Sequence, residues 1–167
     1  MGAKRRKAFT ITVFALYLLI LVWIVVFKLQ FSIADIDRRR ELILIPFSRP
    51  GAVYSGAVIE EMILNVLAFI PVGYGMALIG FPRKVLARAL AGFLLSLVFE
   101  TVQYVFSIGT SDVTDLINNT LGVILGGLAY RLARAVFKSK TETVSDIVLL
   151  VLEVLFVAAY ALLLIVQ

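Results

Sequence analysis

The chain contains no cysteine and no histidine among its 167 residues. The first absence excludes disulfide bonds, thiol nucleophiles and cysteine zinc sites, and the second excludes imidazole bases and imidazole metal ligands. Charge is also scarce, because Asp, Glu, Lys and Arg together make up 16% of the residues, against about 25% in soluble domains. Any acid–base chemistry must therefore come from Asp, Glu, Lys or Tyr side chains, or from a bound metal.

Hydrophobic residues are correspondingly abundant, at 62% of the chain, with a mean hydropathy of +1.04. Soluble domains carry about 45–50% apolar residues, so this composition indicates an integral membrane protein. Five apolar runs approach the roughly 20 residues that a membrane-spanning helix needs. We therefore expect an all-α integral membrane protein in which one domain, residues 1–167, forms a compact bundle of five transmembrane helices. The predicted spans are residues 8–27, 62–81, 87–108, 113–133 and 147–166.

Two apolar segments need separate interpretation. The first run follows four consecutive basic residues, 4–7, as in a signal peptide. It is too long for a usual signal-peptide core and lacks a clear small-residue cleavage site, so we expect a retained helix. Another apolar segment, residues 42–47, is too short to cross a membrane. We expect it to be re-entrant or interfacial, in the first outer loop.

The basic residues indicate an orientation. The net charge is +5, but the Lys and Arg residues lie between the apolar runs, where membrane topology and anionic lipid explain them better than nucleic acid does. We therefore expect no nucleic-acid partner. With the N-terminus in the cytoplasm, the inner segments hold eleven of the 16 basic residues, so we predict a cytoplasmic N-terminus and an external C-terminus. These eleven are Lys4, Arg5, Arg6, Lys7, Arg83, Lys84, Arg88, Arg131, Arg134, Lys138 and Lys140.

The third predicted span carries a polar face. Glu100 and Gln103 are three residues apart and share one side of a helix, with Ser96 one turn earlier. A carboxylate near the middle of a bilayer is expensive and marks a functional site by default. No Lys or Arg lies at a similar depth on the second to fifth spans. The open alternatives are a protonated Glu100 with no functional role, and a Gln103 that only makes a hydrogen bond between helices.

The fourth predicted span also carries polar residues on one helical face. Asp112, Asp115 and Asn119 follow at spacings of three and four residues, so they lie on one helical stripe. Gly122 and Gly126 continue the stripe as a small-xxx-small pair, which lets another helix approach closely. A structural alternative stays open, because Asp112 also fits an N-cap and Asp115 suits the positive end of the helix dipole.

These polar residues are predicted to meet at the outer ends of the spans. Asn65 lies in the first turns of the second span, which enters the membrane from the same side. We expect one outward-opening cavity in which Glu100 takes part in acid–base chemistry. Asp112 and Asp115 would either join that chemistry or bind a divalent cation such as Mg²⁺, which prefers oxygen ligands. The predicted cavity residues are Asn65, Glu100, Gln103, Asp112, Asp115 and Asn119.

Glu153 is a second acid within an apolar run, near the cytoplasmic end of the fifth span. Long Arg side chains can reach along a helix to such a position, so we favour an ion pair with Arg131 or Arg134. Because Glu153 is the only residue that suggests a polar path toward the inner face, a transporter ranks below a binding site or an enzyme.

Four spaced motifs follow one another along the chain. They are Leu44-Ile45-Pro46-Phe47, Asn65-x-x-x-Phe69-x-Pro71-x-Gly73, Glu100-x-x-Gln103 and Asp112-x-x-Asp115-x-x-x-Asn119-x-x-Gly122-x-x-x-Gly126. In this order they resemble the VanZ-like family of bacterial membrane proteins, over residues 42–134. The resemblance implies one VanZ-like transmembrane domain in the bacterial cytoplasmic membrane and a link to resistance against teicoplanin, a lipoglycopeptide antibiotic. It does not by itself imply a reaction.

One position departs from the family pattern. Many members carry an arginine in the hairpin directly before the first aspartate, whereas this chain has Gly109-Thr110-Ser111 there. If that arginine binds an anionic group, a basic residue of the first outer loop must replace it here. The resemblance therefore directs attention to Arg49 and Arg38.

The leading hypothesis is a polar site, open to the outer leaflet, that binds the head group of a membrane lipid or a lipid-linked envelope precursor. In its enzymatic version the site also modifies that head group. The alternatives are a non-catalytic binder of a lipid or glycopeptide, which alters access of the antibiotic to its target, and a small lipid transporter. The sequence leaves the oligomeric state open, a homo-oligomer included. The expected catalytic residues are Glu100, Asp112 and Asp115, and the expected substrate-binding residues are Asn65, Gln103, Asn119 and Arg49.

Overall fold

The computed structural model describes residues 3–26, 40–48 and 56–166, and nearly all of them are helical. Three helical stretches are separately long and apolar enough to cross a membrane, and a fourth, Val113–Leu155, runs through α4 into α5. The all-helical membrane class is therefore confirmed, with four candidate spanning stretches, while the fifth crossing stays a prediction. The helices are α1 (Ala3–Val25), α2 (Gly56–Ile79), α3 (Val85–Phe106), α4 (Val113–Phe137) and α5 (Thr141–Val166), with a 3₁₀ turn, η1 (Lys138–Lys140), before α5.

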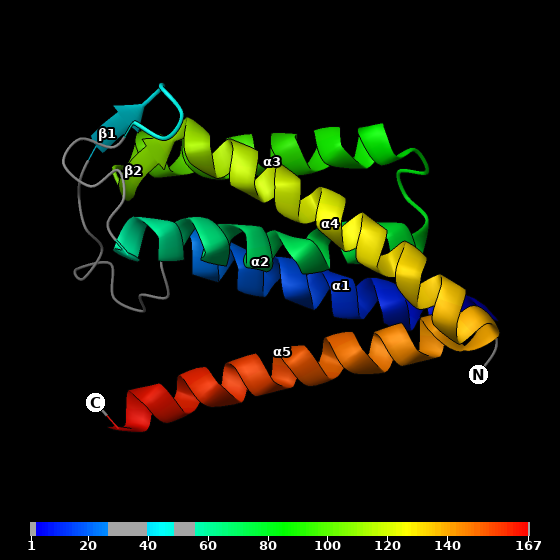
Figure 1. Cartoon of the computed structure of the whole chain (residues 1–167). Helices are drawn as coiled ribbons and strands as arrows, with labels where there is room; N and C mark the ends of the chain where they lie inside the picture. Colours follow the sequence, from blue (N-terminus) through cyan, green and yellow to red (C-terminus); the bar gives the residue numbers. More distant parts are fainter. Residues whose placement is uncertain (1–2, 27–39, 49–55, 167) are drawn as a thin grey trace.

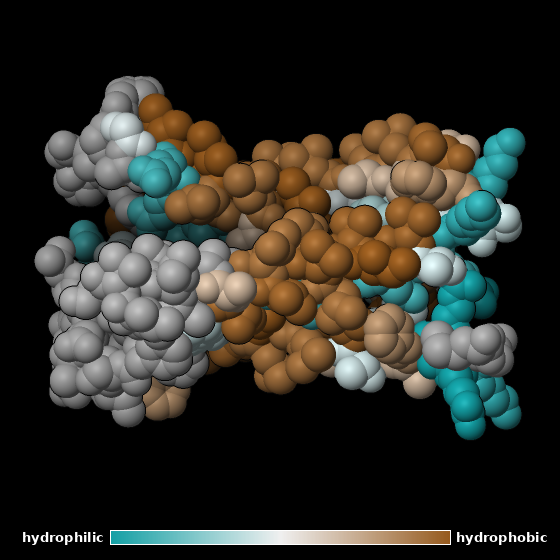
Figure 2. Space-filling model, turned by 90° about the horizontal axis from the view of Figure 1, so that it is seen from below, coloured by the Kyte–Doolittle hydropathy of each residue, from teal (hydrophilic) through white to brown (hydrophobic). Residues whose placement is uncertain are grey.

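The helices alternate in direction between two ends of the bundle. The N-terminus, the α2–α3 connection and the α4–α5 connection lie at one end (Figure 1), which we call the basic end. Figure 2 shows hydrophilic side chains gathered at that end and a hydrophobic band over the middle of the molecule. Many large apolar side chains on this band are exposed, as a lipid-facing surface requires.

Two short strands lie at the opposite end, which we call the strand end (Figure 1). β1 (Arg40–Ile43) pairs in parallel with β2 (Gly109–Asp112), and Ile43 stands opposite Asp112. The segment predicted as re-entrant or interfacial thus begins as a strand, and a re-entrant path is not confirmed. The physical reason is that backbone N–H and C=O groups of an extended segment need partners, which the α3–α4 connection supplies.

Glycine brings α2 and α4 into close contact. A Cβ atom at Gly122 would overlap the backbone oxygen of Val66, and one at Gly126 would overlap the backbone oxygen of Ile70. The predicted close approach through the small-xxx-small pair is therefore confirmed, with α2 as the partner. This contact fixes the polar residues of α4 beside those of α2.

The apolar core lies one helical turn from the polar residues, toward the basic end. Phe69 follows Asn65 by four residues on α2, and Val123 follows Asn119 by four on α4; both apolar side chains are buried. Phe99 of α3 meets Phe69 edge to face, with ring centroids 6.2 Å apart. The core therefore forms a floor beneath the polar residues at the strand end.

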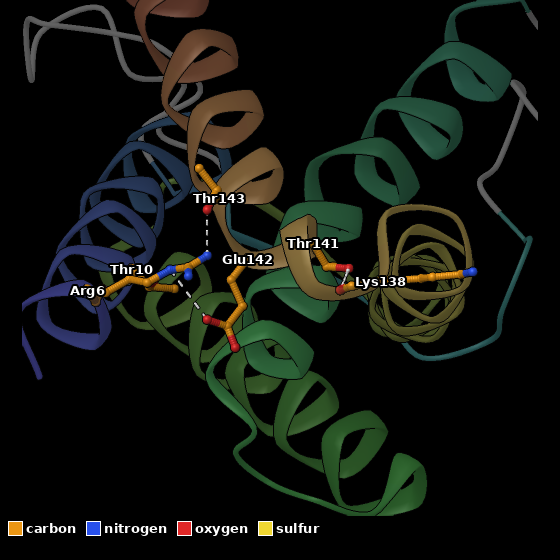
Figure 3. A network of polar contacts seen from close by, with 6 residues as sticks. All are labelled: Arg6, Thr10, Lys138, Thr141, Glu142 and Thr143. Carbon is orange, nitrogen blue, oxygen red and sulfur yellow. Dashed lines mark hydrogen bonds and ion pairs between the residues drawn. The ribbon is translucent and has the colours of Figure 1, made fainter. Parts of the chain in front are cut away.

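The first turns of α5 are held against α1 at the basic end (Figure 3). The Arg6 Nε atom lies 3.4 Å from Glu142 Oε2, and Arg6 Nη2 donates to Thr143 Oγ1 at 2.7 Å. An exposed pair of this kind contributes about 0–1 kcal/mol. These contacts orient α5 more than they stabilise the bundle.

Candidate functional site

A cavity of about 300 Å³ opens at the strand end between α1, α2, α3 and α4. We call it the polar cavity. The structure brings five of the six predicted cavity residues together in its wall and places Asp112 elsewhere. The described residues that line it are Ile24, Val25, Glu60, Glu61, Leu64, Asn65, Ala68, Glu100, Gln103, Asp115 and Asn119.

One side of the polar cavity is held by a bond between α2 and α4. The Asn65 side-chain amide donates from Nδ2 to Asp115 Oδ1 at 2.7 Å. Both side chains are half-buried. Asp115 thus accepts from a neighbouring helix in addition to lying in the first turn of α4, where the helix dipole favours a carboxylate.

Gln103 joins α3 to the end of α1. Its Nε2 donates at 3.0 Å to the backbone oxygen of Val25, one of the carbonyl groups that the end of a helix leaves without an intrahelical partner. A carbonyl oxygen can only accept, so the amide orientation of Gln103 is fixed by this bond. The side chain is 3% exposed, and its Oε1 has no hydrogen-bond partner. The structural alternative for Gln103, a hydrogen bond between helices, is therefore present in the structure, and the side-chain oxygen is left without a partner.

Asn119 leaves a second acceptor in the same wall. Its side chain is fully buried, and Nδ2 donates to the Ser96 hydroxyl at 2.8 Å. Its Oδ1 has no hydrogen-bond partner. A buried polar atom without a partner costs about 1–3 kcal/mol. The polar cavity therefore carries two such groups, from Gln103 and Asn119.

Glu100 lies between the polar cavity and a smaller one. Its side chain is 6% exposed, and Oε2 accepts from the backbone N–H of Asp112 at 3.0 Å. The Ser111 hydroxyl donates to the backbone oxygen of Glu100 at 2.8 Å. The second cavity, which we call the strand-side cavity, measures about 190 Å³. Its lining residues are Leu42, Leu44, Leu97, Glu100, Thr101, Tyr104, Ser111, Asp112, Val113 and Leu116.

Asp112 is the N-cap of α4. Its Oδ1 accepts from the backbone N–H of Thr114 at 2.7 Å, and the side chain is buried. The capping alternative is therefore what the structure shows for this residue. Asp112 lines the strand-side cavity and Asp115 the polar cavity. Within residues 3–26, 40–48 and 56–166, no three Asp or Glu side chains lie close enough together to hold a metal ion.

Two acidic lining residues were not predicted, and the two arginines considered as anion-binding residues are not described. Glu60 and Glu61 at the start of α2 line the polar cavity, although the sequence suggested only loop residues there. The sequence spacing could have identified Glu61, because it precedes Asn65 by four residues and therefore shares its helical face. Arg49 and Arg38 lie outside the described residues.

A third cavity of about 300 Å³ lies between α1, α2 and α5. We call it the apolar cavity, because Glu153 is its only charged lining residue within the described part of the chain. Ile24, Leu64 and Ala68 line both this cavity and the polar cavity. The full set is Tyr17, Ile20, Ile24, Leu64, Leu67, Ala68, Pro71, Leu149, Leu152 and Glu153.

The predicted partner of Glu153 is wrong. Arg131 and Arg134 are exposed on α4, and the described contacts contain no ion pair from either to Glu153. The Glu153 side chain is buried, and its Oε1 has no hydrogen-bond partner. The α4–α5 turn directs Glu153 toward α1 and α2 instead, because it lines the cavity between those helices.

Comparison with known proteins agrees with the motifs. The VanZ/LLP1 family model matches residues 14–134. The chain is also similar to the protein named VanZ of Enterococcus faecium, with 41% identity over 125 residues that cover 71% of each chain. No solved structure matches. The matched range contains every described residue that lines the polar cavity, whereas all of α5 lies beyond it.

Proposed function

The chain belongs to the VanZ/LLP1 family, and from this membership we propose that it is a bacterial inner-membrane protein that binds an envelope lipid or a lipid-linked cell-wall intermediate. The head group would lie in the polar cavity. The link to teicoplanin resistance that the motif resemblance implies fits such a ligand, because altered envelope lipids or precursors change what the antibiotic meets at the cell surface.

The observation that carries the proposal is the junction of two cavities of different character. The polar cavity and the apolar cavity each measure about 300 Å³ and share Ile24, Leu64 and Ala68. Pockets of about 300–1,000 Å³ hold small organic ligands. A lipid is polar at one end and apolar at the other. Its head group would therefore lie in the polar cavity and the start of one acyl chain in the apolar cavity.

The same arrangement suggests which leaflet supplies the lipid. The polar cavity lies at the strand end, away from the hydrophilic side chains gathered at the basic end (Figure 2). Cytoplasmic segments carry the excess of Lys and Arg. With five crossings, a cytoplasmic N-terminus and an external C-terminus, the polar cavity would open to the outer leaflet.

In the enzymatic version of the proposal, Glu100 transfers the proton. It is a buried carboxylate in the wall of the polar cavity, and the Asp112 backbone N–H holds its Oε2 at 3.0 Å. A general acid or base must be positioned within hydrogen-bond reach of the reacting group. Asp115 would be the second carboxylate at the head group, Asp112 would position Glu100, and Arg49 would bind an anionic group. In the binding version the same residues only hold the lipid.

Photolabelling tests the binding site directly. Two analogues of one lipid, with the photoreactive group in the head group or near the start of an acyl chain, are bound to the protein in nanodiscs. The first should label α2, α3 and α4 residues of the polar cavity, and the second should label the apolar cavity, including α5 around Leu149 and Leu152. Labels confined to the outer, exposed faces of the helices would contradict the proposal.

Lipid profiles separate the enzyme from the binder. Cells that express the wild-type chain should contain a lipid species that is missing from cells with Glu100→Gln, a variant that keeps the size of the side chain but cannot act as a carboxylate base. Val98→Ala, an exposed position on the same helix, serves as the matched control. An unchanged profile in wild-type cells that still tolerate the antibiotic would reject catalysis and leave the binding version.

A further inference from the structure

We infer that an anionic phospholipid binds through its phosphate between α3 and α4 at the basic end. The binding residues are Lys84, Arg88, Arg131 and Arg134, which we call the α3–α4 basic cluster. This cluster lies at the opposite end of the bundle from the polar cavity. The inference is therefore independent of the proposed head-group site.

Arg88 lies where α3 and α4 begin to separate. One helical turn nearer the strand end the two helices touch, because a Cβ atom at Gly92 would overlap the Val123 side chain. Toward the basic end they diverge (Figure 1). A Cβ atom at Gly127 would meet only the Arg88 Nη1 atom, at 3.7 Å. The Arg88 side chain therefore extends from α3 to the face of α4, at a point where α4 has no side chain to cover it.

The Arg88 guanidinium keeps one nitrogen available to a ligand. Its Nη2 donates to the backbone oxygen of Arg83 at 3.0 Å, and its Nε is buried without a partner. Nη1 is not among the buried atoms and makes no hydrogen bond within the described residues. A guanidinium presents its N–H donors in a planar fork that suits phosphate oxygens. A phosphate would therefore bind at Nη1, beside Gly127.

The other members of the cluster flank this position. Lys84 precedes Arg88 by four residues on α3, and Arg131 and Arg134 follow Gly127 by four and seven on α4. Residues at these spacings share one helical face. All three side chains are exposed, and long basic side chains can extend along a helix toward a charged group. They add positive charge on both sides of Arg88.

The protein does not neutralise this charge. Residues 62–99 and 116–141 contain no Asp or Glu. The ion pair at the basic end joins Arg6 to Glu142 beside α1 (Figure 3), and none within the described residues involves the cluster. Uncompensated positive charge favours an anionic ligand. The positive-inside rule explains basic residues in cytoplasmic segments, but it does not require an arginine held between two helices.

The surroundings indicate a lipid as the source of the phosphate. Both helices continue from the cluster toward the strand end with exposed apolar side chains, such as Leu90 and Phe93 on α3 and Leu121 and Leu125 on α4. Acyl chains would lie along this surface. Basic sites between membrane helices on the cytoplasmic side bind anionic lipid head groups. With the basic end in the cytoplasm, as proposed above, the lipid comes from the inner leaflet.

Two lipids with identical acyl chains test the inference. The purified full-length protein is offered phosphatidylglycerol, which is anionic, and phosphatidylethanolamine, which is zwitterionic, and native mass spectrometry measures the ratio retained. Each Lys or Arg near an anionic lipid surface strengthens binding by about fivefold. Phosphatidylglycerol should therefore be retained about tenfold or more over phosphatidylethanolamine.

Variants connect this preference to the cluster. Arg88→Gln removes one charge and should lower the ratio by about fivefold. Arg5→Gln makes the same change at an exposed position of α1 at the same end, and should leave the ratio unchanged. If Arg88→Gln fails to fold, the double variant Arg131→Gln with Arg134→Gln changes only exposed side chains and should lower the ratio instead.

Several outcomes would overturn the inference. They are equal retention of the two lipids, equal losses in Arg5→Gln and Arg88→Gln, and a preference that survives in both cluster variants. Displacement of phosphatidylglycerol by inorganic phosphate would contradict a lipid ligand. A lipid held in the polar cavity does not depend on Arg88, so these results leave the proposed function to its own tests.

Discussion

The contact between α2 and α4 gives the sharpest test of the structure, because two adjacent glycines differ in what surrounds them. A Cβ atom at Gly126 would overlap the backbone oxygen of Ile70, whereas one at Gly127 would meet only Arg88 Nη1, at 3.7 Å. Gly126→Ala therefore forces α4 away from α2, and Gly127→Ala does not. Both variants make the same chemical change in the same helix, so each controls for the other.

The expected magnitude follows from this difference. Overpacking a close contact costs about 1–3 kcal/mol, and a backbone atom cannot turn aside as a side chain does. Replacing Gly by Ala also adds about 1 kcal/mol of helix propensity, but this gain is common to both variants and cancels in their difference. Gly126→Ala should therefore be less stable than Gly127→Ala by about 1–3 kcal/mol.

Thermal unfolding in detergent, followed by circular dichroism, measures the difference. For a chain of this size, 1 kcal/mol shifts the midpoint by roughly 2–4 °C. Asn119 lies on the same stripe of α4 as Gly126, and Asp115 lies one turn before Asn119. A displaced α4 would move both polar-cavity residues, so Gly126→Ala should also weaken lipid retention, whereas Gly127→Ala should not. Equal midpoints for the two variants would refute the packing contact that positions the polar cavity.

Two further predictions concern the carboxylates at the strand end. Asp112→Ala should lower the free energy of unfolding by about 0.5–2 kcal/mol, because it removes the α4 cap. Asp112→Asn keeps a capping oxygen, so its free energy of unfolding should stay within a few tenths of a kcal/mol of the wild type. Thermal unfolding measures both variants, and equal losses would contradict the capping role. Removal of divalent cations with EDTA should leave lipid retention in native mass spectra unchanged, because Asp112 and Asp115 line different cavities. Loss of the bound lipid on chelation would restore the expectation of Mg²⁺ at these residues.

Local periodicity accounts for the features that could be predicted. Every predicted span overlaps a helix, although the bounds differ by up to six residues, because long apolar runs need intrahelical hydrogen bonds in lipid. Glu100, Gln103 and Asn119 could be assigned to inward faces because residues three and four apart share one side of a helix.

Contacts distant in the sequence account for what could not be predicted. β1 precedes α2 in the sequence and β2 follows α3, yet the two strands pair. No local sequence pattern encodes a partner at that separation. The same holds for Glu153, whose direction depends on the turn between α4 and α5.

The sequence by itself thus determined that this is a helical membrane protein with costly polar residues on two neighbouring helices. The tertiary structure decided their roles. It assigned Asp112 to a helix cap and brought Glu61 into the polar cavity. It also joined the Gln103 nitrogen to the end of α1 and left its oxygen without a partner. The physical reason is that a side chain's face follows from its own helix, whereas its hydrogen-bond partner depends on which other helix packs against that face.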